Sequence, residues 1–288
     1  MPIEITGLCH NYKKGTPFEK QVLHDINLHI EDGEFVGIIG PTQSGKTTLA
    51  QHLNALYIPQ KGKVVVNNFN TADKKADLVA LRHEVGYVFQ NPDYQLFSPT
   101  VGEDISFGPS NQKLSAKEVH QRVHEVMDQV GLDYDIFYKR DIFALSGGQK
   151  RRTAIAGVLA CRPQILILDD VTAGLDPRGR EEILEVVRKL HREQRITIIF
   201  ISNSMDEVAE LAERIVVIDQ GRIADDGATR EVFNQSEKLH SIGLELPEVM
   251  KITAMLRACG FNLPSTVLNL EEALSAVAAA LQEGQVTD

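Results

Sequence analysis

Short apolar runs alternate with longer segments whose apolar residues recur at helical spacing along most of the chain. The runs predict strands, and strands that alternate with helices are typical of a parallel sheet covered by helices. The predicted strands are residues 3–9, Phe35–Ile39, Val64–Val66, Val85–Phe89, Ile165–Leu168, Thr197–Ile201 and Ile215–Ile218. The first and last of these segments are rich in turns and charges, so we expect both in an antiparallel flank of an α/β fold.

Helical patterns replace strand patterns between about residues 91 and 161. Ser115 and Glu118 match a capping box, and Gly131 is placed to end the helix that they begin. We interpret this region as a helical subdomain inserted into a main domain of residues 1–234.

The remaining residues, 235–288, form a C-terminal helical extension in this interpretation. Asn269 and Glu272 can cap a helix there. Its apolar stripe consists of Leu270, Leu274, Val277 and Leu281. The stripe fits either a helix packed on its own domain or a dimerisation appendage, and the pattern alone does not separate the two.

The composition is that of an ordinary globular chain of 288 residues with a net charge of −10. The acidic balance argues against a basic nucleic-acid surface, so no nucleic acid is expected as a partner. Three isolated cysteines fit a reduced cytoplasmic protein better than a disulfide framework or a zinc site. No apolar stretch approaches the roughly 18 residues that a transmembrane helix needs, so any membrane role is expected to be peripheral.

The segment GPTQSGKT, directly after the strand Phe35–Ile39, predicts a phosphate-binding loop. A strand, a glycine-rich loop and a helix N-terminus together direct backbone N–H groups and a helix dipole at phosphate oxygens. Lys46 is expected to reach the β- and γ-phosphates of ATP, and Thr47 to hold Mg²⁺. The predicted ATP-binding residues of this loop are Gly40, Pro41, Thr42, Gln43, Ser44, Gly45, Lys46, Thr47 and Thr48.

Two adjacent carboxylates end the apolar run ILILDD. A carboxylate at the end of a buried strand can hold hydrated Mg²⁺, which suits Asp169. The next residue, Asp170, is then placed to polarise the attacking water.

The pentapeptide LSGGQ at 145–149 lies between the phosphate loop and the paired carboxylates. With this order of motifs, residues 3–230 resemble the ATP-binding cassette (ABC) ATPases. The resemblance implies a P-loop NTPase fold with an antiparallel β flank. It also implies two cassettes that close head to tail, so that Ser146, Gly147, Gly148 and Gln149 act on the ATP of the partner.

Further site residues follow from the same resemblance. Tyr12 resembles the aromatic residue that stacks on adenine. Gln90 resembles the glutamine that contacts Mg²⁺, and Asn203 occupies the position of the switch histidine. The resemblance thus implies Asp170, Asn203 and Gln90 as catalytic residues, and Thr47, Gln90 and Asp169 as metal ligands.

A narrower resemblance rests on FQNPDYQLFSPTVGEDISFGP, LSGGQKRRTAIAGVLA and the tail ELPEVMKITAMLRACGFNLP. These segments resemble the ATPases of energy-coupling-factor (ECF) transporters, which import vitamins or transition-metal ions. The implied partners are a second ABC ATPase, a transmembrane coupling subunit and a membrane protein that captures the substrate. The implied location is the cytoplasmic face of the cell membrane, and the tail favours dimerisation through the C-terminal helices.

Several residues depart from the family pattern within one composite site. Asp170 stands in place of the usual Glu and is one methylene shorter. Asn203 replaces a histidine, and Gln43 replaces a glycine, while Ser146 and its neighbours are unaltered. General-base assistance is worth about 10²–10⁴ in rate, so a short carboxylate could nearly silence hydrolysis. We therefore expect an asymmetric heterodimer in which this chain binds Mg-ATP but hydrolyses it slowly. The alternatives are a soluble, non-transport ABC ATPase and a nucleotide-binding scaffold without hydrolysis.

Overall fold

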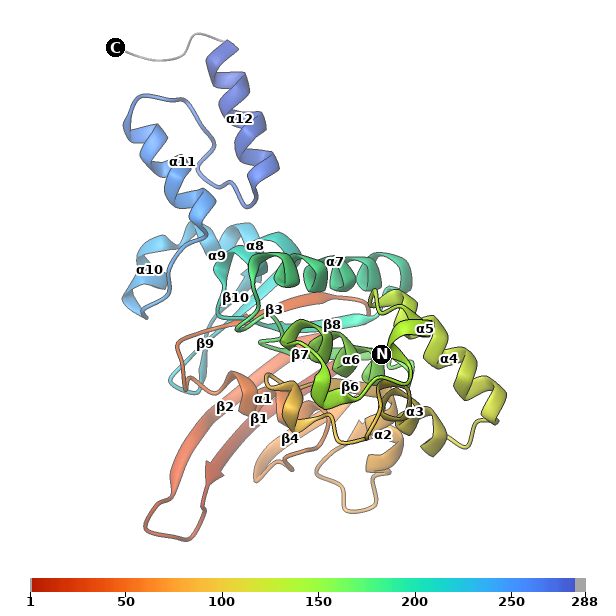
Figure 1. The fold of residues 1–288 in the computed structure, drawn as a ribbon. Coiled ribbons are helices and arrows are strands. Elements are labelled where there is room, and N and C mark those ends of the chain that lie inside the picture. The colour runs from red at the N-terminus through yellow and green to blue at the C-terminus, as the bar shows by residue number, and fades with distance from the viewer. Residues whose placement is uncertain (1, 283–288) are drawn as a thin grey trace.

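Two β-sheets form the centre of the molecule, which we describe for residues 2–282 of a computed structural model (Figure 1). The smaller sheet is antiparallel, with the order β2-β1-β4-β5. Its strands are β1 (Ile3–Tyr12), β2 (Lys20–Ile30), β4 (Lys61–Val66) and β5 (Phe69–Asn70). The antiparallel flank expected for the first segment is therefore confirmed, although the patterns had not predicted its partner β2.

The larger sheet has six strands in the order β10-β9-β3-β8-β7-β6, and it is parallel apart from β10. Its strands are β3 (Phe35–Ile39), β6 (Val85–Val88), β7 (Ile165–Asp169), β8 (Thr197–Ile201), β9 (Arg214–Asp219) and β10 (Arg222–Ala228). Parallel strands place their carboxyl ends at one edge, where ligands bind in open α/β sheets. The loops after β3, β6, β7 and β8 therefore meet at this edge.

The expectation that 215–218 lies in an antiparallel flank was wrong. This segment belongs to β9, which pairs in parallel with β3 inside the larger sheet and is antiparallel only to its hairpin partner β10. Ile215, Val216, Val217 and Ile218 are all fully buried. A strand buried on both faces belongs in the interior of a covered sheet, which explains its position.

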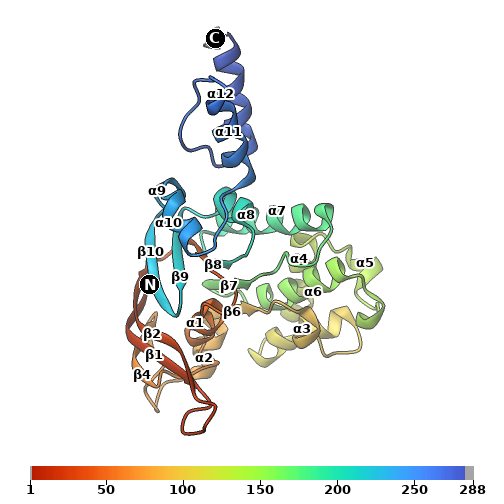
Figure 2. The same cartoon turned by 90° about the vertical axis from the view of Figure 1, so that its left-hand side faces the viewer.

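Apolar cores lie on both faces of the larger sheet. One core packs the antiparallel sheet and α1 (Lys46–Leu53) against one face. The other packs helices against the opposite face, as Figure 2 shows with the antiparallel sheet and the helices α3–α6 on opposite sides.

The segment between β6 and β7 is helical, apart from its loops. Its elements are η1 (Pro92–Tyr94), α3 (Val101–Asn111), α4 (Ala116–Gln129), α5 (Tyr134–Phe137), η2 (Ile142–Ala144) and α6 (Gly147–Leu159); α2 (Leu78–Glu84) precedes β6. The capping box of Ser115 and Glu118 begins α4, and Gly131 follows its end with a φ of 68°. Both local features agree with the sequence prediction.

The remaining helices are α7 (Pro177–Gln194), α8 (Met205–Leu211), α9 (Thr229–Asn234), α10 (Ser236–Ser241), α11 (Glu248–Ala258) and α12 (Leu270–Gln282). Residues 283–288 of the predicted extension lie outside the described part. No helix among residues 2–282 is both long enough and apolar enough to span a bilayer.

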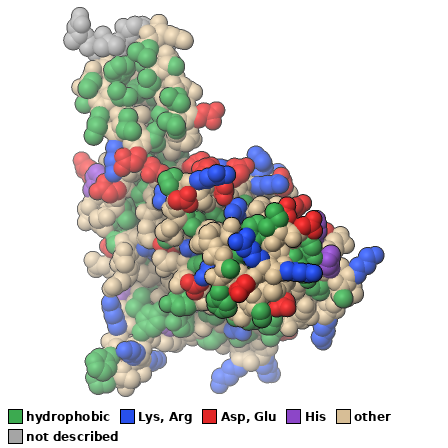
Figure 3. All heavy atoms as spheres, in the orientation of Figure 1, with side chains coloured by type: hydrophobic (Ala, Val, Ile, Leu, Met, Phe, Trp, Pro, Cys, Tyr) green, Lys and Arg blue, Asp and Glu red, His purple; other side chains and the backbone are tan. Residues whose placement is uncertain are grey.

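The last two helices form a lobe that projects from the rest of the molecule (Figure 1). Asn269 caps α12 by accepting a hydrogen bond from the backbone N–H of Glu272. The predicted stripe of α12 is largely open to solvent, since Leu270, Leu274 and Leu281 are 70, 62 and 59% exposed. Figure 3 shows hydrophobic side chains gathered on this lobe. The stripe is thus not covered by the chain's own domain.

Candidate functional site

The phosphate loop, residues 40–47, connects β3 to α1 and depends on glycine at two positions. Gly40 has a φ of 153°, and a Cβ atom there would lie 2.0 Å from the carbonyl oxygen of Ile218. Gly45, the residue before α1, has a φ of 112°. Lys46 donates hydrogen bonds from Nζ to the carbonyl oxygens of Gly40 (2.7 Å) and Pro41 (3.0 Å). The loop thus places an ammonium group at the helix N-terminus, where anions are favoured.

Gln43 occupies the left-handed region of the backbone, with a φ of 66°. This conformation costs a non-glycine residue about 1–2 kcal/mol, and it occurs where the family pattern has a glycine. The side chain is exposed and lines the pocket described next.

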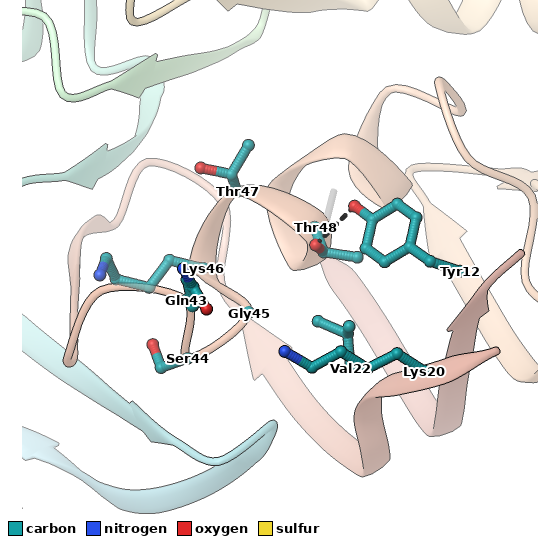
Figure 4. Close-up of a pocket in the computed structure, with 9 residues that line it drawn as sticks. All are labelled: Tyr12, Lys20, Val22, Gln43, Ser44, Gly45, Lys46, Thr47 and Thr48. Atoms are coloured by element: carbon teal, nitrogen blue, oxygen red, sulfur yellow. Dashed lines mark hydrogen bonds between the residues drawn. The ribbon is translucent and has the colours of Figure 1, made fainter. Parts of the chain in front are cut away.

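A pocket of about 310 Å³ opens beside the phosphate loop, within the range of small-molecule sites (Figure 4). The Tyr12 hydroxyl is hydrogen-bonded to Thr48 Oγ1 at 2.9 Å, which fixes the ring at the pocket wall. Figure 4 shows Tyr12 across the pocket from Val22 and Lys20. The lining residues are Tyr12, Lys20, Val22, Gln43, Ser44, Gly45, Lys46, Thr47 and Thr48. The structure therefore brings Tyr12 and the phosphate loop together in one pocket.

Asp169, at the end of β7, lies beside the start of α1. Its Oδ1 accepts a hydrogen bond from Thr47 Oγ1 (3.2 Å), and its Oδ2 accepts one from the Tyr87 hydroxyl (2.7 Å). Burial raises the pKa of Asp169, and the two hydrogen bonds and Lys46 oppose that shift. Burial likewise lowers the pKa of Lys46, against the attraction of Asp170 and Asp169.

The donor set at this position fits Mg²⁺. The Thr47 hydroxyl and the Asp169 carboxylate are hard oxygen donors close to each other, and Mg²⁺ is usually held by one or two carboxylates together with substrate phosphates and water. Within residues 2–282 no cluster of three or more His, Cys, Asp or Glu side chains could form an all-protein metal cage.

The three residues predicted to be catalytic meet at one oxygen atom. Asp170 Oδ2 accepts hydrogen bonds from Gln90 Nε2 (2.9 Å) and from Asn203 Nδ2 (3.0 Å). Gln90 follows β6 and Asn203 follows β8, so the two neighbours of β7 in the sheet supply these amides. Asp170 itself has a φ of 50°, a left-handed conformation that Asp tolerates better than most residues.

The LSGGQ segment does not join this site within one chain. Ser146 caps α6: its Oγ accepts a hydrogen bond from the Gln149 N–H, and the Gln149 side chain accepts one from the Ser146 N–H. In the described part of the chain, no other group lies within 4 Å of a Cβ position at Gly147 or Gly148, so this helix start is open there. None of these residues is among the described lining of the pocket.

Four residues of the site region were missed by the sequence analysis. Lys20 and Val22 line the pocket because Lys20 is the cross-strand neighbour of Tyr12. The alternation of apolar and polar residues from Ile26 to Ile30 could have identified their strand. Tyr87 lies within a predicted strand, but nothing local indicated its bond to Asp169. Arg151, on α6, is buried and donates hydrogen bonds to the carbonyl oxygens of Phe89 and Gln90.

Comparison with known proteins identifies the family of this chain. Residues 23–173 match the family model described as ABC transporter. The chain belongs to the ABC transporter family. It is 49% identical to the energy-coupling factor transporter ATP-binding protein EcfA2 of Clostridium perfringens (strain 13 / Type A), over 96% of this chain and 97% of that one. It is 48% identical to EcfA2 of Clostridioides difficile (strain 630), over 95% of each chain.

Solved structures of ABC ATPases have the same fold. The structure of cbiO1 from Clostridium perfringens, part of the ABC transporter complex cbiONQ, is 36% identical with a TM-score of 0.73, covering 88% of this chain and 98% of cbiO1. A dimeric post-hydrolysis state of the cassette MJ0796 bound to ADP and Pi is 30% identical with a TM-score of 0.71, covering 79% and 99%. The predicted fold class and the resemblance to ECF ATPases are confirmed. The chain is an ATP-binding ABC ATPase subunit whose hydrolysis is coupled to transport.

Proposed function

We propose that this chain is one of two unequal ATPases of an ECF importer of vitamins or transition-metal ions. It binds Mg-ATP at its own site, with adenine against Tyr12, the phosphates on the phosphate loop and Lys46, and the metal at Thr47, Asp169 and Gln90. When bound, Mg²⁺ neutralises charge that develops on the transferring phosphoryl group. The residues of this chain position ATP and exclude solvent water from it. They also place the Asp170 carboxylate toward the one water that attacks the phosphate.

The convergence of Gln90 and Asn203 on Asp170 Oδ2 carries the proposed asymmetry. A general base needs its oxygen within hydrogen-bond reach of the attacking water. Here the carboxylate is one methylene shorter than Glu, and one of its oxygens is engaged by two amide donors, which orient it. Asn203 can hydrogen-bond a phosphate but cannot carry a proton as histidine can. Slow hydrolysis at this site follows from the two features together.

The open helix start of α6 supports a second role, toward the ATP of the partner ATPase. Ser146 and the N–H groups of Gly147 and Gly148 form an anion cradle that no group among residues 2–282 covers. In this proposal, the partner carries Glu and His at its own site and uses the cradle of this chain.

Two exposed apolar surfaces support the proposed assembly at the cytoplasmic face of the membrane. Leu270, Leu274 and Leu281 of the C-terminal lobe match a contact with the same lobe of the partner ATPase, because contiguous exposed apolar patches mark interaction sites. Phe97 and Phe107 stack edge to face at 4.8 Å on the helical subdomain, and both are largely exposed. They suit docking of the transmembrane coupling subunit, and a separate membrane protein captures the substrate.

The test uses the purified transporter with both ATPases. Asp170→Asn is expected to leave transport within about twofold of wild type, whereas the equivalent change of the partner's catalytic carboxylate abolishes it. Ser146→Arg is expected to stop turnover by filling the cradle. If Asp170→Asn abolished transport and the partner's change did not, the proposed asymmetry would be wrong. Full activity of Ser146→Arg would remove the role in the partner site.

A further inference from the structure

Arg151 is a buried cation that contacts two loops of the site. It is 4% exposed, and within residues 2–282 no carboxylate forms an ion pair with it. Its Nη1 donates hydrogen bonds to the carbonyl oxygens of Phe89 (3.1 Å) and Gln90, and its Nη2 donates one to Ala173 (3.3 Å). Burial lowers its pKa, and the charge of Asp170 opposes that shift. A buried charge held mainly by carbonyl groups is costly, so these contacts must keep a defined geometry.

The contacts join segments that follow neighbouring strands. Gln90 comes after β6 and donates to Asp170, while Ala173 lies three residues beyond Asp170 in the loop after β7. Arg151 itself belongs to α6, whose first turn carries the cradle of Ser146. The Arg151 guanidinium therefore hydrogen-bonds to both loops beside Asp170. It does so from α6, the helix whose first turn is proposed to contact the partner's ATP.

Two further contacts fasten the segment after β6 to α6. Lys150 Nζ lies 2.7 Å from Asp93 Oδ1, and Gln95 Nε2 donates to the carbonyl oxygen of Ala154 at 2.7 Å. The Lys150 contact is exposed at its Asp93 end and is weak in water. Arg151 is buried, so its hydrogen bonds contribute most to this connection.

We propose that Arg151 is a positioning residue that transmits occupancy of this chain's own nucleotide site to the cradle at Ser146. The inference rests on the proposed function, because it needs the cradle to act on the partner's ATP. When Gln90 and Asp170 adjust to a bound nucleotide, the carbonyl groups of Phe89, Gln90 and Ala173 move with them. Arg151 follows these carbonyls and carries the first turn of α6 to the position that the partner site requires. Binding at the slow site thereby controls hydrolysis at the fast one.

The experiment is a double-mutant cycle in the assembled transporter. Arg151→Met removes the charge at similar length, and Lys46→Ala empties the own site. ATP turnover is measured for wild type, each single variant and the double variant. Lys46→Ala and Arg151→Met are each expected to lower kcat by about 10- to 100-fold, since a misplacement of about 1 Å costs about that much. The kcat of the double variant is expected to lie within about twofold of the kcat of either single variant.

Two matched changes separate positioning from general stability. Arg152→Met affects the next residue of α6, whose ion pair with Glu182 lies outside the site, and it is expected to leave turnover unchanged. Arg151→Lys keeps the charge but lacks the planar fork, so partial recovery of kcat is expected. The KM for ATP is expected to stay within twofold in every Arg151 variant, because Arg151 does not line the pocket.

The outcomes separate the inference from the proposed function. If the two losses multiply, or if Lys46→Ala has no effect in the wild-type background, Arg151 does not transmit occupancy and the inference is overturned. If Ser146→Arg leaves turnover intact, the cradle does not serve a partner site, and the proposed function and the inference both fail. Loss of turnover in Ser146→Arg together with multiplicative losses in the cycle would overturn the inference alone.

Discussion

Replacing Asp170 by Glu tests whether the short carboxylate limits hydrolysis at this site. The added methylene extends the side chain by about 1.5 Å, the length of one carbon–carbon bond. Since a displacement of about 1 Å can change a rate by about 10²-fold, we expect turnover at this site to rise about 10- to 100-fold. The gain is limited by Asn203, which still lacks the proton of a histidine.

The same change is expected to cost stability. Asp170 has a φ of 50°, which Asp tolerates better than Glu. Its hydrogen bonds from Gln90 and Asn203 must also shift with the longer side chain, and each contributes about 1 kcal/mol. We expect the free energy of unfolding to fall by about 1–2 kcal/mol, which lowers the melting temperature by several degrees.

The assay is ATP hydrolysis by the assembled transporter in which the partner's catalytic carboxylate has been removed. Residual turnover then reports on this chain alone. Asp170→Asn is the matched control, since it has the same size but cannot accept a proton. If Asp170→Glu bound ATP normally and still hydrolysed it no faster than wild type, the length of the carboxylate would not be the limit, and the argument would be refuted.

Three further predictions concern acid stability, the adenine wall and the C-terminal lobe. Burial lowers the pKa of His52 to about 4, below the ordinary histidine value of 6.5. The native state therefore resists protonation, and stability is lost as the pH falls through this window. Between about pH 7.5 and 5.5, the free energy of unfolding measured in urea should fall by about 1 kcal/mol less in His52→Asn than in wild type. The control His240→Asn, at an exposed histidine, should show the same fall as wild type. An equal pH dependence in wild type and His52→Asn would contradict this prediction. Tyr12→Ala should weaken ATP binding to the isolated chain about 10-fold or more by fluorescence titration, whereas Tyr12→Phe, which keeps the ring but loses the hydroxyl bonded to Thr48, should stay within about threefold. Leu274→Glu should dissociate the ATPase pair in size-exclusion chromatography with unchanged ATP affinity, and an intact pair would exclude that face from the contact.

Much of the site could be predicted from the sequence because its motifs are local. The phosphate loop, the carboxylates after β7 and the cap at Ser146 each follow from a strand or helix end within a few residues. Gln43 shows how far the resemblance extends, since the family pattern has a glycine at this position and its φ of 66° lies in the left-handed region that favours glycine. The sheet position of β9 was not predictable in this way, because an apolar run does not reveal which strands flank it.

The sequence by itself determined that this protein has a phosphate-loop motif, paired carboxylates and an LSGGQ segment at a helix start, because each is encoded by contiguous residues. Only the tertiary structure decided what surrounds Asp170. Gln90 and Asn203 come from segments far from it in sequence, and they meet at Asp170 because β6 and β8 flank β7 in the sheet. Long-range contacts of this kind depend on strand order and helix packing, which no short stretch of residues specifies.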